Sequence, residues 1–200
     1  MSKKVFIACE YSGVVRDAFI KRGYDAISCD ILPTESPGPH IQGDIKDIDL
    51  TQFDLIIAHP PCTHLCNSGA RWFKDKKDLQ EEALDFVKYF LNAPVKYVAV
   101  ENPVGIISSR IEKPAQYIQP YHFGDKASKK TGLWLRNLPT LVPTNVVVPE
   151  TITTSKGRVF DKHWYWTCSL PLSIRGKARS KTFQGIADAM AEQWGSLLDE

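Results

Sequence analysis

The sequence predicts an α/β fold built around parallel strands, and three observations support that prediction. Residues 55–58 (LIIA) form a continuous apolar run, which is typical of a strand buried on both faces of a parallel sheet. The run ends at His59-Pro60-Pro61, where two prolines without N–H groups cannot extend the ladder. Residues 4–58 alternate between strand-like and helix-like segments. We therefore expect a ligand site at the carboxyl edge of the sheet, where open α/β folds bind ligands.

The segments that precede this strand follow the order β-α-β-loop-β. Residues 4–9 are expected to form a strand, residues 10–13 a turn, and residues 14–22 an amphipathic helix that ends at a glycine. A second strand is expected over residues 25–30, with an acid at its end. A loop rich in proline and glycine then leads toward residues 55–58.

The later segments continue the α/β pattern. Helical periodicity predicts a helix over residues 81–91, and an apolar run predicts a strand over residues 97–100. Residues 114–150 are rich in Pro, Thr and Val, so short strands and loops are expected there. Residues 184–198 predict a closing helix.

Length and composition indicate one globular domain. The chain has 200 residues, of which 43% are hydrophobic and 24% charged, as in ordinary soluble proteins. No apolar run approaches the ~20 residues of a membrane span, and the first residues lack a signal-peptide pattern, so no membrane association is expected. Five irregularly spaced cysteines predict reduced thiols in the cytoplasm.

Positive charge is concentrated late in the chain, although the net charge of the whole sequence is only +2. Residues 156–181 hold seven Lys and Arg residues against one acid, and aromatic residues are interleaved with them. Such a mixture suits a polynucleotide, because cations contact phosphates and rings stack on bases. A small hydrophobic hairpin with its rings packed inward is an equally good interpretation of some of these aromatic residues.

Two residues at predicted strand ends are candidates for catalysis. Cys62 follows the Pro-Pro turn, and a thiol there is a candidate nucleophile, although a free cysteine is more often a small buried hydrophobe. Glu101, at the end of the strand over residues 97–100, is followed by Asn102-Pro103, a pair that also suits the start of a helix. Both residues are expected above the same edge of the sheet.

Other residues at this edge suggest a nucleoside cofactor. Ser12-Gly13 forms a tight turn after the first strand, and Asp30 ends the second strand, where a carboxylate can accept hydrogen bonds from ribose hydroxyls. Asp44 follows Gly43 at the same edge, and an exposed loop carboxylate is the alternative. Cys62, His64 and Cys66 lack the second ligand pair that zinc sites need, so no metal is predicted.

With these residues in view, the chain resembles the DNA cytosine-C5 methyltransferases. IACEYSGVVRDAF is similar to the family's opening S-adenosyl-L-methionine loop, Pro61-Cys62 to its catalytic dipeptide, and Glu101-Asn102 to the pair that grips the target pyrimidine. Ser68-Gly69 resembles the loop that follows the cysteine, and FQGIADAMAEQWG resembles the closing block. The resemblance implies catalytic roles for Cys62 and Glu101. It implies cofactor contacts for Cys9, Glu10, Ser12, Gly13, Asp30, Ile31, Asp44, Ile45, His59 and Pro60, and substrate contacts for Asn102, Lys129 and Lys130.

The resemblance also implies a fold and a partner. The fold is a Rossmann-like, mostly parallel sheet with helices on both faces and a small irregular β insertion. Residues 1–200 form one methyltransferase domain, with a reduced target-recognition segment over about 135–180 and a closing helix over 181–198. DNA is the expected partner, and a protein partner is a possible source of target specificity. The alternatives are a free pyrimidine nucleotide or RNA as substrate, or a catalytically inactive nucleic-acid-binding module.

The sequence departs from the family pattern in three places. His59-Pro60-Pro61-Cys62-Thr63 replaces Phe-Pro-Cys-Gln, and its His-Pro-Pro is also similar to a motif of amino-methyltransferases. The Gln-x-Arg-x-Arg block is absent, with lysines in its place, and the target-recognition segment is short. In the family's chemistry a thiolate adds to C6 of cytosine. We therefore expect a cation, Lys129 or Lys130, near Cys62 and a raised pKa at Glu101.

Overall fold

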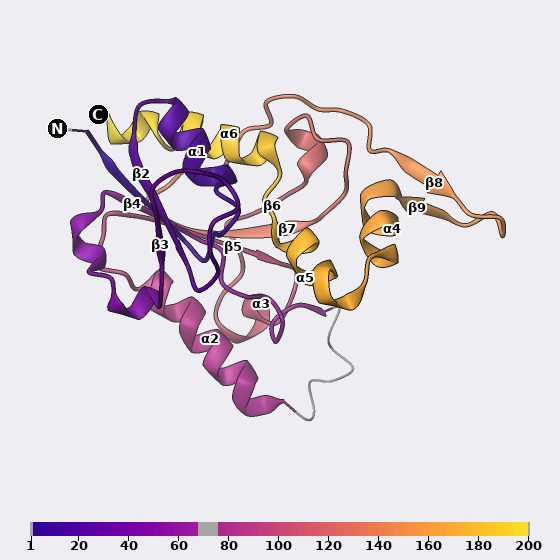
Figure 1. Cartoon of the computed structure of the whole chain (residues 1–200), viewed down its shortest axis with the longest axis horizontal. Helices are drawn as coiled ribbons and strands as arrows, with labels where there is room; N and C mark the ends of the chain where they lie inside the picture. The colour runs from indigo at the N-terminus through magenta and orange to yellow at the C-terminus, as the bar shows by residue number, and fades with distance from the viewer. Residues whose placement is uncertain (1, 68–75, 200) are drawn as a thin grey trace.

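The computed structural model describes residues 2–67 and 76–199, and a seven-stranded sheet forms its centre (Figure 1). The strands of the sheet are β1 (Lys4–Ala8), β2 (Asp25–Asp30), β3 (His40–Gln42), β4 (Leu55–Ala58), β5 (Tyr97–Pro103), β6 (Gln116–Ile118) and β7 (Thr131–Arg136). Their order across the sheet is β3-β2-β1-β4-β5-β7-β6. The first five strands are parallel, and β7 runs antiparallel to both of its neighbours.

Helices cover both faces of the sheet (Figure 1). On one face, α1 (Val14–Lys21) and α6 (Gln184–Gln193) pack together and share a core cluster with the sheet. On the other face, α2 (Lys77–Leu91) and α3 (Ile107–Arg110) contribute to a second core cluster. β4 is buried along its whole length, because it lies between the parallel strands β1 and β5 with a helical layer on each side. The predicted α/β class is confirmed.

Most element boundaries agree with the predicted ones to within a few residues. α2 begins at Lys77, four residues before the predicted start, because its first turn is charged and mostly exposed and so carries no apolar periodicity. The closing helix ends at Gln193 and is followed by a short 3-10 turn, η5 (Ser196–Leu198). The shorter 3-10 turns η1 (Ile45–Asp47), η2 (Leu50–Gln52) and η4 (Pro120–His122) lie in connections.

An insertion between β7 and α6 projects from the side of the sheet (Figure 1). It contains the antiparallel pair β8 (Thr151–Thr153) and β9 (Val159–Asp161), followed by α4 (Lys162–Ser169) and α5 (Leu172–Ser180). The predicted small β insertion is therefore present, but the two helices were not predicted. Among the described residues of these helices only Thr167 is buried, so neither helix has the apolar stripe that a sequence pattern can detect.

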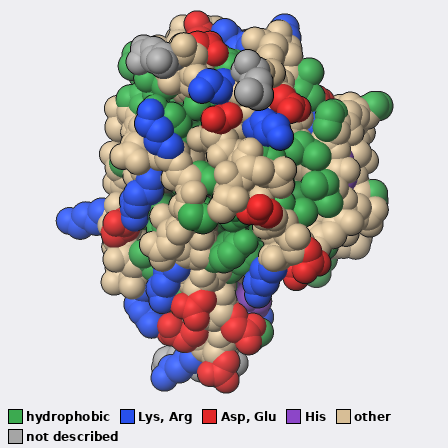
Figure 2. All heavy atoms as spheres, turned by 90° about the vertical axis from the view of Figure 1, so that its left-hand side faces the viewer, with side chains coloured by type: hydrophobic (Ala, Val, Ile, Leu, Met, Phe, Trp, Pro, Cys, Tyr) green, Lys and Arg blue, Asp and Glu red, His purple; other side chains and the backbone are tan. Residues whose placement is uncertain are grey.

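The surface at the β3 side of the sheet carries charges of both signs. Figure 2 shows this face, with Lys and Arg interspersed with Asp and Glu around hydrophobic side chains. The cationic insertion lies at the opposite end of the molecule in Figure 1. None of the helices in the described ranges combines the length and apolar character that crossing a bilayer requires.

Candidate functional site

The parallel strands deliver several of the predicted site residues to one edge of the sheet. The strand register aligns Ala8 with Ala58, and Ala58 with Val100. The residues that follow these positions must therefore lie side by side at the carboxyl edge: Cys9 after β1, His59 after β4, and Glu101 within β5. Asp30 ends β2 beside them.

The loop that carries Cys62 is anchored to the chain beyond Glu101. Asn102, which is 1% exposed, donates a hydrogen bond from Nδ2 to the backbone carbonyl of Pro60 at 2.7 Å. The amides of Leu65 and Cys66 both donate to the carbonyl of Cys62 at 3.0 Å, so Cys62 begins a single helical turn. The side chain of Asn102 thus fixes the Pro-Pro turn that precedes the thiol.

A close backbone approach at Gly105 completes this anchoring. Ile106 N donates to Leu65 O at 2.9 Å, and Asn67 N donates to Val104 O at 3.1 Å. A Cβ atom added at Gly105 would lie only 2.0 Å from Leu65 O, so no other residue fits here without movement of the backbone. The same contact therefore sets the positions of the cysteine loop and of the strand end that carries Glu101.

Glu101 is buried and paired with a histidine. His59 Nδ1 donates to Glu101 Oε2 at 2.9 Å, and the two side chains are 7% and 11% exposed. Burial favours the neutral carboxyl, but the hydrogen bond from His59, the charge of Lys129 and the Thr131 hydroxyl outweigh it and lower the pKa of Glu101. The expected raised pKa is wrong for this structure, because the sequence pattern contained no sign of the His59 contact.

Cys62 is held as a thiol. Its hydrogen bond with Cys66, its burial and the negative charge of Glu101 raise the pKa of Cys62 well above the ordinary value, and Lys129 opposes this shift. Lys129 thus acts on Cys62 as expected of a nearby cation, and its Nζ donates to Arg179 O at 2.8 Å. Lys130 instead lies over the ring of Tyr117, at 4.4 Å from its centroid.

A large cavity of about 860 Å³ opens at this edge of the sheet. Nine of the predicted site residues line it: Cys9, Asp30, Ile31, Asp44, Ile45, His59, Cys62, Lys129 and Lys130. Glu101 borders a much smaller cavity, of about 10 Å³, which shares Lys129 with the large one. His59 is therefore the residue that both lines the large cavity and contacts Glu101.

The predicted cofactor turn after β1, residues 10–13, lies mostly away from the large cavity. Glu10, Ser12 and Gly13 are not among the described residues that line the large cavity. The Glu10 carboxylate accepts hydrogen bonds from Val15 N at 2.7 Å and from Arg16 N at 3.2 Å, so it caps the start of α1. Gly13 adopts φ +77°, and a Cβ there would lie 2.4 Å from the buried guanidinium of Arg16. These three residues stabilise the turn between β1 and α1 and do not line the large cavity.

The cavity wall includes residues that the sequence did not reveal. Tyr11 donates from its hydroxyl to Lys177 O at 2.8 Å and lies 3.0 Å from Ser180 Oγ. These contacts bring α5 across the cavity, where Lys177, Arg179 and Ser180 line it together with Tyr11. Because α5 has no apolar periodicity, only the cationic composition of residues 156–181 could have indicated its involvement.

The insertion contributes one exposed aromatic residue to the wall of the same cavity and presents two more to solvent. Trp164 lines the cavity, is 46% exposed and stacks on Phe160 at 5.3 Å. Tyr165 and Trp166 are 40% and 50% exposed. The alternative in which these rings pack inward as a hydrophobic hairpin therefore does not describe α4, which presents them to solvent.

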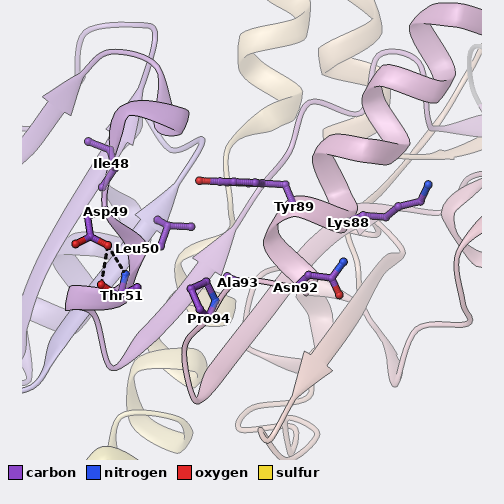
Figure 3. Close-up of a pocket in the computed structure, with 9 residues that line it drawn as sticks. All are labelled: Ile48, Asp49, Leu50, Thr51, Lys88, Tyr89, Asn92, Ala93 and Pro94. Atoms are coloured by element: carbon purple, nitrogen blue, oxygen red, sulfur yellow. Dashed lines mark hydrogen bonds between the residues drawn. The ribbon is translucent and has the colours of Figure 1, made fainter.

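A second hollow, of about 350 Å³, lies at the other edge of the sheet (Figure 3). It is formed between η2 and the end of α2, with Tyr89 extending across it toward Leu50. The hydrogen bonds drawn in Figure 3 join Asp49 to Thr51, at 2.6 and 3.0 Å. No predicted site residue lines this hollow.

The remaining predictions concern metals and the loop after the cysteine. Within residues 2–67 and 76–199, no group of three or more His, Cys, Asp or Glu side chains is arranged to hold a metal ion. Ser68-Gly69, which resembles the family's loop after the cysteine, lies outside the described residues.

Comparison with known proteins gives likenesses among solved structures only. No family model matches the chain, and no curated protein sequence matches it. A solved structure of a candidate DNA modification methyltransferase, encoded within a prophage of E. coli, resembles it with a TM-score of 0.47 and 13% identity. The match covers 74% of this chain and 52% of the other, so the chain spans about half the length of that protein. A likeness of this extent identifies neither the family nor the reaction of this chain.

Proposed function

We propose that the protein is an S-adenosyl-L-methionine-dependent methyltransferase that methylates C5 of cytosine in DNA through a covalent adduct with Cys62. One observation carries the proposal. A cysteine and a glutamate that is hydrogen-bonded to His59 stand at adjacent strand ends, beside a cavity whose walls bear two further carboxylates, Asp30 and Asp44.

The cavity walls fit the adenosyl part of the cofactor. Asp30 Oδ1 accepts from Leu32 N at 2.9 Å, and the carboxylate has further lone pairs that can accept from ribose hydroxyls. Asp44 Oδ1 accepts from Lys46 N at 3.0 Å and keeps its other oxygen for an amino group. Ile31 is 74% exposed at the cavity, an apolar surface on which a flat ring can pack.

The proposed chemistry assigns a separate task to each catalytic group. When bound, the cofactor supplies an electrophilic methyl group. Cys62 gives up its proton to water in the cavity, and the thiolate adds to C6 of cytosine, which places carbanion character on C5. C5 then takes the methyl group, its proton passes to water, and elimination of the thiolate releases 5-methylcytosine. Glu101 delivers a proton to N3 of the ring during the addition and so stabilises the charge that the addition creates. Lys129 favours the thiolate form of Cys62.

The insertion is suited to DNA as the substrate. Its exposed ring Trp164 and the α5 cations Lys177 and Arg179 line the cavity. Stacking on bases and contact with phosphates need this combination. A duplex target has to be flipped out of its stack to reach Cys62.

The test is transfer of tritium from labelled S-adenosyl-L-methionine to duplex DNA, followed by nucleoside analysis. The proposal predicts label in 5-methylcytosine with wild-type protein and none with Cys62→Ser. Parallel reactions with dCMP and with RNA identify a different substrate. Label in N6-methyladenine or N4-methylcytosine, or undiminished transfer by Cys62→Ser, would overturn the proposal.

A further inference from the structure

We infer that His59 is a positioning residue and proton carrier for Glu101, so that the His59–Glu101 pair acts as a single acid in the transfer reaction. The inference rests on the proposed function and adds a residue to it. His59 belongs to the His-Pro-Pro segment in which the chain departs from the family pattern.

Geometry provides the first support. The hydrogen bond between His59 Nδ1 and Glu101 Oε2 is 2.9 Å long, and both side chains are about nine-tenths buried. The register places the two residues on adjacent parallel strands, one position beyond the aligned pair Ala58 and Val100. His59 N also donates to Ala8 O at 2.9 Å, which fixes the backbone that carries the ring. The strand register and the contact with Ala8 therefore hold the pair in place at the carboxyl edge of the sheet.

The second support is the other ring nitrogen. His59 Nε2 is buried and has no hydrogen-bond partner among the described residues. A buried polar atom without a partner is costly, so an additional hydrogen bond to Nε2 in the bound complex would be favourable. His59 lines the large cavity and Glu101 borders the small one that shares Lys129 with it, so the imidazole contacts both the carboxylate and the wall of the ligand space.

The charges around the pair explain why a carrier is needed. Lys129 and the His59 contact favour the ionised form of Glu101, which in that form has no proton to give. The other titratable group that interacts with the pair is the thiol of Cys62, whose pKa the negative charge of Glu101 helps to raise. Its hydrogen bond with Cys66 and its burial raise that pKa further, so the thiol is a poor proton donor to Glu101.

The proton transfer balances as follows. In the active form the ring carries protons on both nitrogens, and Glu101 is a carboxylate. As the thiolate adds to the pyrimidine, Nδ1 passes its proton to Oε2, and the carboxyl passes a proton to N3. His59 is left neutral, with its remaining proton on Nε2. After methyl transfer the C5 proton passes to water in the cavity, and the C6–S bond breaks so that Cys62 leaves as the thiolate. The N3 proton returns to Glu101 and from there to His59 Nδ1, which restores the starting form of the pair.

The test compares His59→Asn with wild type and with the matched variant His64→Asn. An asparagine at 59 keeps an N–H donor near the Nδ1 position but cannot carry a second proton. His64 lies in the same loop, has a buried Nδ1 without a partner among the described residues, and is not one of the described residues that line the large cavity. His59→Gln serves as a second variant if His59→Asn fails to fold.

We expect His59→Asn to lower kcat by about 10²-fold, the usual contribution of a general acid. Cofactor affinity, measured by calorimetry, and KM for DNA should change less than about twofold. The decline of kcat at alkaline pH should begin at a lower pH than in wild type, because Glu101 alone must then hold the proton. His64→Asn should show neither change.

The outcomes separate this inference from the proposed function. Methyl transfer by wild type together with an unchanged kcat and pH profile in His59→Asn overturns the role of His59 and leaves the proposed function standing. A fall in kcat without any displacement of the pH profile assigns His59 a purely structural role and also overturns the inference. Absence of transfer by wild type overturns both.

Discussion

Replacing Gly105 with alanine tests whether the contact between the cysteine loop and the end of β5 sets the site. The added Cβ would lie 2.0 Å from Leu65 O, whereas ordinary contacts are no shorter than about 3.4 Å. The two segments must therefore separate by about 1.4 Å. This movement breaks the 2.9 Å hydrogen bond from Ile106 N to Leu65 O. Overpacking costs about 1–3 kcal/mol, and the lost hydrogen bond costs about 1 kcal/mol more.

The expected result for Gly105→Ala is a loss of about 2–4 kcal/mol in the free energy of unfolding. For a chain of this length that corresponds to a fall in Tm of roughly 4–16 °C. The displacement also moves Cys62 relative to Glu101, and a shift of about 1 Å at reacting groups costs about 10²-fold in rate. Differential scanning calorimetry and methyl incorporation measure the two effects.

Gly176→Ala is the control for stability, because a Cβ at this helical position meets no atom within 4 Å. It should leave Tm unchanged or raise it slightly, since alanine favours helix more than glycine does. If Gly105→Ala has the same Tm as Gly176→Ala, the close approach does not hold the loop, and the reasoning is refuted.

Four further predictions follow from the site. Cys62→Ser should abolish methyl transfer and leave the Kd for S-adenosyl-L-methionine within about twofold in calorimetry; a tenfold weaker Kd would place Cys62 in cofactor binding instead. Asp30→Asn should weaken cofactor binding at least about tenfold, because the neutral amide is a poorer acceptor for ribose hydroxyls; an unchanged Kd removes Asp30 from that role. Trp164→Ala should weaken duplex binding in mobility shifts by about tenfold, consistent with the loss of one stacked base, without any change in cofactor affinity. Because the folded-state pKa of Glu101 is lowered, its ionisation stabilises the fold above the ordinary glutamate pKa, and that contribution is lost as pH falls through the folded-state value. Acid titrations of urea unfolding should therefore show a shallower dependence for Glu101→Gln, and parallel curves for the two proteins would contradict the assigned pKa direction.

The sequence carried enough information to predict the sheet and the edge of the sheet at which the candidate site lies. Apolar runs ended by prolines and acids marked where β2, β4 and β5 stop, and parallel strands bring such ends to one edge whatever the details of packing. It was therefore predictable that Cys62 and Glu101 both lie at the carboxyl edge of the sheet. That Glu101 faces a separate small cavity was not, because side-chain direction depends on tertiary contacts.

Other features depend on contacts between segments that are distant in sequence. The His59 contact that lowers the pKa of Glu101 follows from strand register, which no local pattern reveals. Tyr11 contacts α5, which lies more than 160 residues later in the sequence. α5 has no buried apolar stripe, so a sequence pattern does not reveal this helix. Gly13 looked like a cofactor turn, but the Arg16 guanidinium occupies the space beside it, a placement that only packing decides.

The central claim is that the sulfur of Cys62 bonds to C6 of the target cytosine. A duplex containing 5-fluorocytosine tests it most directly, because fluorine at C5 cannot leave as the proton does, and the methylated adduct is trapped. After incubation with S-adenosyl-L-methionine, the account predicts a covalent protein–DNA species whose cross-linked peptide contains Cys62 in mass spectrometry. Methylation of ordinary duplex without any trapped species on the fluorinated one, or a cross-link at a different residue, would contradict it.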